Sequence, residues 1–215
     1  MKSKFIILLF IIAFIFISCE TEIERKERLA IKEQHEIELY QQKEKEVKAE
    51  AVRLEQVRIE QEIQLEKQRE EKELYDRFIN NSLTTGATPY SKYYGRNASC
   101  NDNNCSQIKI TTSNSDVLVT IKKKDKVIRH AFIQAGDSYT FSFPNGTYQA
   151  FFYYGKGWNP DKPMKKGEIT GGFISNEDFG KDEPQFLFNN ILRYELILQK
   201  NGNFSTEPSN SEEAL

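Results

Sequence analysis

Hydrophobic and polar positions follow three different patterns along the chain. Phe5 to Ile17 form an unbroken apolar run. From Glu20 to Ser82 there is no Gly or Pro, and apolar residues are scattered among Glu, Gln, Lys and Arg, which are good helix formers. From Gln107 onwards apolar and polar residues alternate, which is the period of a half-buried β-strand. The sequence therefore predicts a long helix followed by a small antiparallel β-sandwich, an α plus all-β fold.

The predicted helix covers residues 19–79. About 60 residues at 1.5 Å each make a rod on the order of 90 Å, which a single domain does not bury along its length. One state that fits is a coiled coil, because apolar residues recur at a heptad spacing that is best between Ile37 and Leu54. The other is a single solvated helix with i,i+4 ion pairs such as Glu44–Lys48. The sequence leaves both open and allows a homo-oligomer through the helix.

The rest of the chain divides into a linker, a sandwich and a tail. Residues 80–106 contain Asn-Asn-Ser, Thr-Thr-Gly and Tyr-Tyr-Gly, and this composition predicts a linker. Residues 107–204 carry the alternating pattern and predict the sandwich. Residues 205–215 are polar and predict a disordered tail.

Short strands are expected throughout the sandwich, about six or seven in number, as in many antiparallel sandwiches. Asn145-Gly146 predicts a turn between two of them, because Asn and Gly accept positive φ. The expected strands lie at 108–110, 117–122, 127–133, 138–143, 147–154, 169–175 and 192–198.

The apolar run at the N-terminus has the length of a secretory signal. Lys2 and Lys4 precede it, and 13 apolar residues suit a signal-peptide core. A transmembrane helix needs about 18 or more. Residues 1–18 are therefore expected to be a signal peptide. The run ends in Ser18-Cys19, and a small residue directly before a cysteine resembles the lipobox of bacterial lipoproteins.

The lipobox resemblance implies cleavage before Cys19 and lipidation of that cysteine, so that a lipid anchor holds the protein on a membrane. Acidic residues follow at Glu20, Glu22 and Glu24. In lipoproteins the residues after the cysteine help to choose the membrane. The resemblance thus implies a cell-envelope location, and we expect the outer membrane, on its periplasmic face or at the cell surface.

Cys100 and Cys105 remain when Cys19 is set aside. An even remainder in an exported protein predicts a disulfide. The alternative is a metal or redox pair, but Cys-x4-Cys without a neighbouring His or a further Cys is a poor zinc site. The disulfide is the favoured interpretation, and it is expected to fix a local turn.

The stretch from Ile133 to Tyr148 ends in Pro-Asn-Gly-Thr-Tyr after an alternating run. It resembles the strand-turn-strand of Ig-like and carboxypeptidase-regulatory-type sandwich modules. The resemblance covers 16 residues. It implies a fold and carries no active site to this chain.

Composition and charge narrow the range of activities. Thirty Lys and Arg stand against 32 Asp and Glu, so the net charge of −2 argues against a strongly basic nucleic-acid binder. A catalytic serine needs a histidine base. The sandwich offers only His130, in mid-strand, and no Gly-x-Ser-x-Gly motif. Carboxylates between Asp161 and Glu183 keep a hydrolase as a remote alternative. The sequence predicts no catalytic residue, no cofactor and no metal ligand.

One aromatic cluster has the composition of a binding loop. It contains Tyr153, Tyr154, Lys156, Trp158 and Asn159, separated by glycines. Aromatic side chains with a polar tip suit contacts with a glycan, the cell wall or a protein partner. The alternative is that Trp158 folds back onto the sandwich core. The expected function is a non-catalytic binding module on a helical stalk, and the second hypothesis is a periplasmic structural spacer that contacts the cell wall or an envelope partner.

Overall fold

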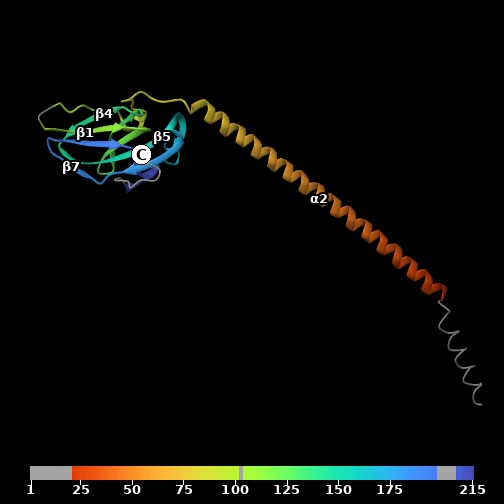
Figure 1. Cartoon of the computed structure of the whole chain (residues 1–215). Helices are drawn as coiled ribbons and strands as arrows, with labels where there is room; N and C mark the ends of the chain where they lie inside the picture. Colours follow the sequence, from red (N-terminus) through yellow and green to blue (C-terminus); the bar gives the residue numbers. More distant parts are fainter. Residues whose placement is uncertain (1–20, 102–103, 198–206) are drawn as a thin grey trace, which may run out of the picture. The chain divides into compact units, whose positions relative to one another are not determined.

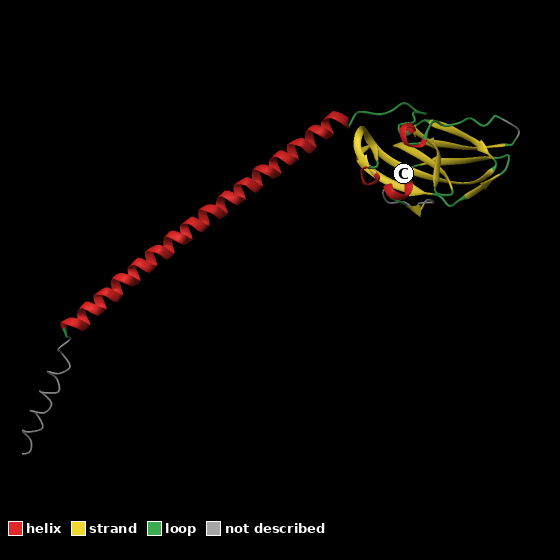
Figure 2. Cartoon of the chain, turned by 180° about the vertical axis from the view of Figure 1, so that it is seen from behind, coloured by secondary structure: helices red, strands yellow, loops and turns green. Residues whose placement is uncertain are grey.

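The computed structural model describes residues 21–101, 104–197 and 207–215. The predicted signal peptide and Cys19 lie outside these ranges. One long helix is followed by two sheets that are mostly antiparallel, as Figures 1 and 2 show, which confirms the predicted fold class. The chain divides into two compact units, Met1–Lys67 and Gln68–Leu215.

Helix α2 runs from Glu22 to Phe78, a length of 57 residues and about 85 Å. It begins with a capping box. The Thr21 hydroxyl accepts the Glu24 backbone N–H at 3.4 Å, and the Glu24 carboxylate accepts the Thr21 N–H at 3.0 Å. No residue of α2 is buried. Within the described residues, no helix combines the length and the apolar character needed to cross a bilayer.

The surface of α2 carries both i,i+4 ion pairs and exposed apolar side chains, the features on which the two predicted states of the helix depend. Two expected ion pairs form, Glu44–Lys48 at 2.6 Å and Glu22–Lys26 at 3.5 Å. Such exposed pairs contribute only about 0.3–0.5 kcal/mol each. Large apolar side chains also stay exposed along the helix, among them Ile37, Val47, Leu54 and Leu65.

The strands form two sheets. The three-stranded sheet has the order β4-β1-β8, and the larger sheet has the order β3-β2-β5-β6-β9, with β7 paired to β5. The strands are β1 (Cys105–Thr112), β2 (Asp116–Lys123), β3 (Lys126–Ile133), β4 (Ser138–Pro144), β5 (Gly146–Met164), β6 (Ile169–Lys181), β7 (Gln185–Leu187), β8 (Ile191–Leu196) and β9 (Glu207–Pro208).

One strand pair differs from the antiparallel expectation. β8 pairs with β1 in parallel, whereas the other strand pairs of the described residues are antiparallel. β8 returns to the small sheet only after the long β5–β6 hairpin and β7, so no tight turn fixes its direction.

The first core lies between the two sheets. It is built from the alternating positions that the sequence predicts, because alternate residues of a strand share a face. The inward residues include Ile108, Ile110, Val117, Val119, Ile121, Phe141, Phe143, Tyr148, Phe152 and Leu196. A period-two pattern thus places these side chains correctly.

A second core covers the opposite face of the larger sheet. Leu118, Phe132 and Phe151 project from β2, β3 and β5 into this core. Tyr90, which is fully buried, comes from the segment expected to be a linker. Residues 83–94 therefore pack as part of the domain, because this face of the sheet is apolar and must be covered.

The same segment also protects the edge of β3. The Phe132 N–H donates to the Ala87 carbonyl at 2.8 Å, and the Gly86 N–H donates to the Phe132 carbonyl at 2.8 Å. The Asn97 side chain then bonds both backbone groups of His130, at 2.8 and 3.1 Å. An uncovered edge strand would offer these groups to another chain.

The C-terminal segment does not behave as the expected disordered tail. Residues 198–206 lie outside the described ranges, but 207–215 form β9 and helix α4 (Ser211–Ala214). Asn210 caps α4 by accepting the Glu213 N–H at 3.0 Å. Ala214 and Leu215 are each 1% exposed and belong to the second core. Two apolar residues dock this polar segment onto the sheet.

Cys100 and Cys105 lie at disulfide distance. Their sulfur atoms are 2.11 Å apart and their Cα atoms 5.8 Å apart. The pair precedes and begins β1, so a bridge here ties the entering chain to the sheet.

We expect the purified protein to hold this pair as a disulfide. An alkylating agent without reductant should leave the intact mass unchanged, and after reduction it should add two alkyl groups at Cys100 and Cys105. Replacing both cysteines by serine should lower the free energy of unfolding by about 2 kcal/mol, because the bridge restricts the unfolded chain. Alkylation of both residues in unreduced protein would contradict the prediction.

The sandwich has two distinct ends. At one end the segment after α2 meets the loops, where the Ser82 hydroxyl donates to Asp116 at 2.8 Å and the Thr85 hydroxyl donates to Asp137 at 2.5 Å. The other end, called the distal end below, gathers four connections, since β5 begins there and β1 enters there. The described residues of these connections are 100–101, 104, 124–125, 145 and 188–190.

Candidate functional site

The predicted aromatic binding loop is not a loop. Its residues all lie in β5, where Tyr153 is 1% exposed, Trp158 2%, Asn159 4% and Tyr154 7%. Among them only Lys156 is exposed. The prediction of an exposed aromatic recognition loop is therefore wrong, and the alternative, in which Trp158 packs into the core, is confirmed.

Two glycines explain why this segment continues as a strand. A Cβ on Gly155 would lie 2.3 Å from the Cβ of Phe173, so the absent side chain makes room for that ring. Gly157 has a φ of +76° and lies against the backbone of Phe78 and Ile79. The pairing register with β6 shifts between Tyr154 and Lys156. Glycine thus permits a β-bulge and close packing here, where the sequence alone suggests a flexible loop.

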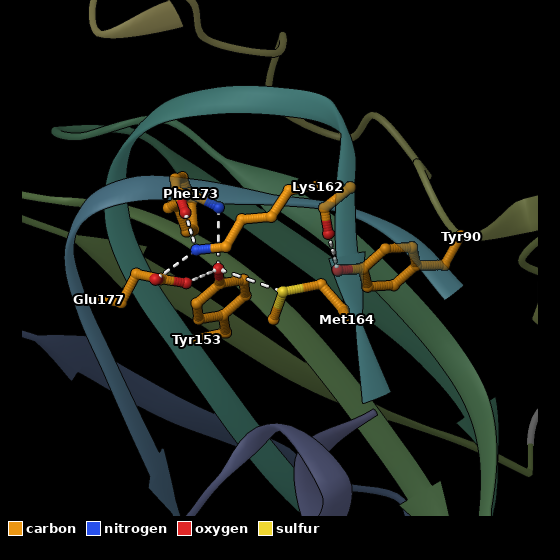
Figure 3. A network of polar contacts seen from close by, with 7 residues as sticks. Tyr90, Tyr153, Lys162, Met164, Phe173 and Glu177 are labelled. Carbon is orange, nitrogen blue, oxygen red and sulfur yellow. Dashed lines mark hydrogen bonds and ion pairs between the residues drawn. The ribbon is translucent and has the colours of Figure 1, made fainter. Parts of the chain in front are cut away.

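A network of polar groups surrounds the Tyr153 hydroxyl, as Figure 3 shows. The hydroxyl accepts the Phe173 N–H at 2.8 Å and donates to the Glu177 carboxylate. Lys162 pairs with the same carboxylate and donates to the Phe173 carbonyl at 2.6 Å. The Met164 sulfur lies 4.0 Å from the hydroxyl. Each polar group of this network finds its partner on the facing strand or within the hairpin.

The electrostatics of the network favour a structural role. Burial raises the pKa of Tyr153 well above its usual range, and the hydrogen bond to the Glu177 carboxylate raises it further. A phenol held neutral in this way donates a hydrogen bond and does not act as a base near neutral pH. Lys162 and Glu177, with side chains 26% and 33% exposed, close the network towards solvent. The arrangement fastens β5 and β6 to each other.

Trp158 is the centre of the second core. Its ring lies edge-to-face with Phe132 and Phe173, at centroid distances of 5.7 and 5.4 Å. The Tyr90 ring lies 6.2 Å away, and the Tyr90 hydroxyl donates to the Gly171 carbonyl at 2.6 Å (Figure 3). Asn81 bonds both backbone groups of Trp158, at 2.6 and 2.8 Å. This aromatic cluster therefore joins the segment after α2 to the sheet.

His130 is buried between β3 and the segment before β1. It is 1% exposed, and its Nε2 accepts the Tyr90 N–H at 3.1 Å. The rings of Tyr90 and Tyr94 flank it at 6.0 and 5.9 Å. Burial lowers the pKa of His130, and a hydrogen bond to the Thr88 backbone opposes part of that shift. The neutral imidazole is a structural hydrogen-bond acceptor here, as expected for a histidine on a strand face.

The folded protein should lose stability when His130 is forced to take a proton. Its pKa is lowered by folding, so its contribution is complete above the unfolded value of about 6.5 and is lost as pH falls below it. We expect the free energy of unfolding to fall more steeply between about pH 7 and 5 in wild type than in His130→Gln. His35→Gln, on the exposed helix, is the matched control and should keep the wild-type slope. Equal slopes in all three proteins would contradict the prediction.

Two of the acidic residues considered for hydrolysis are held in hydrogen bonds. Glu177 is held by Tyr153 and Lys162, and Asp182 accepts the Tyr194 hydroxyl at 2.6 Å. Across the described ranges, no group of three or more His, Cys, Asp and Glu side chains could hold a metal ion. A groove on the surface includes Asp161 and Lys162 and is also lined by Leu74, Arg77, Phe78, Asn159, Pro163 and Ile174.

The most unusual surface lies at the distal end, and the sequence did not indicate it. Phe186 and Phe188 are 70% and 63% exposed, and they flank Leu187, which is buried. Ile191, which begins β8, is 49% exposed. Phe-Leu-Phe in a sequence suggests a buried strand, and only the pairing of β7 with the start of β5 turns its two phenylalanines outwards. These three side chains, Phe186, Phe188 and Ile191, are called the distal apolar patch.

Comparison with known proteins adds no relative to this picture. No family model, curated protein or solved structure matches the chain.

Proposed function

We propose that the protein is a lipid-anchored component of a bacterial cell envelope that presents a non-catalytic β-sandwich for binding. Cys19 would carry the lipid after removal of residues 1–18, and α2 would link that anchor to the sandwich. The basis for the anchor is the N-terminal sequence, in which a basic start and an apolar run end at Ser18-Cys19.

The observation that carries the stalk role is the exposure of α2. A helix of 57 residues without one buried side chain adds nothing to a hydrophobic core. It does add about 85 Å of reach. A helix of this kind suits a spacer between an anchor and a folded domain.

The binding role rests on the construction of the sandwich. Two of its carboxylates considered for hydrolysis, Glu177 and Asp182, are engaged in hydrogen bonds, whereas Phe186 and Phe188 at the distal end are left in water. Exposed apolar patches on small soluble domains commonly mark interaction sites. The distal apolar patch therefore takes the place of the aromatic loop as the candidate surface.

A second candidate, the periplasmic spacer, draws on the apolar side chains of α2. Ile37, Val47 and Leu54 lie in the stretch where the heptad spacing is best and are more than half exposed. Pairing of two or more copies along α2 would cover them. Such a rigid bundle would suit a protein that holds envelope layers at a fixed separation.

Two measurements test the anchor and the orientation. The mass of the N-terminal peptide of the membrane-extracted protein should show an acylated Cys19, and Cys19→Ser should release the protein from membranes. Protease treatment of intact cells, followed by an antiserum against residues 105–196, then locates the sandwich. Digestion in intact cells supports the surface binding module. Protection until the outer membrane is opened favours the spacer, and an unmodified Cys19 refutes the anchor.

A further inference from the structure

We infer that the distal end of the sandwich binds an anionic lipid surface. This inference deepens the proposed binding function and rests on it only for the choice of the sandwich as the binding part.

The distal apolar patch is held rigidly. The Asn145 side chain donates to the Asn189 side chain at 2.8 Å and accepts the Asn189 N–H at 2.9 Å. The Asn190 side chain accepts the Phe188 N–H at 3.1 Å. These bonds fix the turn that carries the phenylalanines, so the rings are presented in water without local unfolding. Rings that are already in place lose little conformational entropy on binding.

The same asparagines argue against a sugar ligand. A glycan site needs free polar side chains to bond the hydroxyl groups of a sugar. At the distal end the amide groups of Asn145 and Asn189 bond each other, and Asn145 also accepts the Ser106 hydroxyl at 2.7 Å. Exposed apolar and cationic side chains, among them Phe186, Phe188 and Lys124, lie at the same end.

One group of cations comes from the turn between β2 and β3. Lys123, Lys124 and Lys126 are exposed, with Asp125 among them. The Lys123 Nζ lies 5.6 Å from the centre of the Tyr148 ring. Tyr148 pairs with Gln185, directly beside Phe186 in β7. The lysine turn and Phe186 therefore lie at the same end of the sandwich.

A second pair of cations lies beside Ile191. Lys109 of β1 and Arg193 of β8 are direct neighbours in the parallel register, one step along the face from Gln107 and Ile191. Like charges placed opposite each other on a sheet are unfavourable in the free protein. An anionic partner at this position would relieve that repulsion.

The neighbouring anions do not cancel this charge. Asp125 lies within the lysine turn, and Glu195 follows Arg193 on β8. Asp182 is held by the Tyr194 hydroxyl, and Glu183 is next to it in sequence. Against these four carboxylates stand five cations, and three of the five are gathered in the lysine turn.

Exposed aromatic and aliphatic side chains flanked by lysines are the pattern of interfacial membrane binding. The apolar side chains enter the boundary between headgroups and acyl chains, while the lysines remain among the anionic headgroups. Phosphatidylglycerol is the probe we choose because it combines both chemistries in one surface.

The test captures vesicles with the full-length protein. Protein is held on beads by an antibody to a peptide of α2, and fluorescent vesicles are added. One set contains phosphatidylcholine alone and the other contains phosphatidylcholine with phosphatidylglycerol. A lipid on Cys19 would raise capture of both sets alike. The excess of anionic over neutral capture therefore reports the distal end, while the effect of Cys19→Ser on neutral capture reports the anchor.

Wild type should capture anionic vesicles in excess, and rising salt should weaken that excess because it screens the lysines. Phe186→Ser with Phe188→Ser should reduce the excess about tenfold or more, since two apolar side chains no longer leave water. Ile63→Ser with Leu65→Ser, which are 60% and 59% exposed on α2, is the matched apolar control and should leave it unchanged.

The charge contribution has its own matched pair of variants. Lys124→Gln with Lys126→Gln should weaken the excess several-fold. Lys156→Gln with Lys166→Gln is the control and should leave the excess unchanged. Lys166 matches Lys124 because both are exposed and have a positive φ, 52° and 57° respectively. Equal capture of neutral and anionic vesicles by wild type would overturn the inference. Capture that requires membranes still carrying their proteins would also overturn it and would indicate a protein partner.

Discussion

Replacing Trp158 by alanine is expected to lower the free energy of unfolding of the sandwich by about 3–5 kcal/mol. The side chain is 2% exposed and contacts rings from three segments, so its removal leaves a cavity that the surrounding aromatic side chains cannot fill. Small domains are stable by about 5–15 kcal/mol in total, so the loss is a large part of that stability. Calorimetry of the sandwich transition measures it.

Two comparisons separate this effect from a role in binding. Lys156→Ala changes an exposed neighbour on the same strand and should leave the transition unchanged. Because Trp158 is the only tryptophan, its fluorescence in wild type reports this site alone, and it should be blue-shifted and shielded from iodide. Ready quenching by iodide, together with a small loss of stability in Trp158→Ala, would contradict the buried position.

Deleting residues 211–215 is expected to cost a similar amount, about 3–5 kcal/mol, because Leu215 fills the second core. The segment also supplies polar contacts. The Thr120 hydroxyl donates to the Ala214 carbonyl at 2.6 Å, and Lys181 pairs with Glu213 at 2.6 Å. Removing the segment would expose the apolar face of β2 and β5 to water.

Denaturant unfolding and amide hydrogen exchange both measure this loss. Protection of the Thr120 and Tyr94 amides should fall most, because these residues contact the deleted segment. Glu212→Gln is the control within the same segment. Its ion pair with Lys166 is long, at 3.8 Å, and exposed, so it should cost little. Unchanged hydrogen-exchange protection of these amides after the deletion would contradict the docking of this segment and would support the disordered tail predicted for residues 205–215.

The helix and several strands could be predicted because local pattern decides them. Ser138 to Phe143 alternates polar with aromatic residues, and the structure buries Phe141 and Phe143 against the opposite sheet. The absence of Gly and Pro after Glu20 predicts a helix whose end, at Phe78, differs by one residue from the expected boundary. In both cases neighbouring residues carry enough information.

β5 could not be predicted at its full length because a tertiary contact decides it. Gly155 is required where Phe173 crosses the strand, and these residues are 18 positions apart. From the sequence alone, glycines beside Trp158 favour a mobile loop. The prediction of an aromatic binding loop around Trp158 was wrong for the same reason. A buried cluster and an exposed cluster of aromatic residues have the same composition, so the sequence does not distinguish them.

The sequence of β2 carries a signal of the second core. Val117 to Ile121 is apolar at four of five positions, and all five are buried. A strand that is apolar on both sides is covered on both faces. That pattern alone implies that something outside the two sheets covers β2, although it does not say that Tyr90 and Leu215 do so.

The origin of the second core has a consequence for the order of events during synthesis. Tyr94, in helix α3 (Ser91–Tyr94), donates its hydroxyl to the Leu215 carbonyl, across 121 positions of chain. Contacts of such high sequence separation form late and slow the folding rate. A chain synthesised only as far as residue 210 therefore lacks Ala214 and Leu215 and cannot close this face of the domain. The second core would then be completed only after residues 211–215 have been synthesised, however early β2 and β3 have paired.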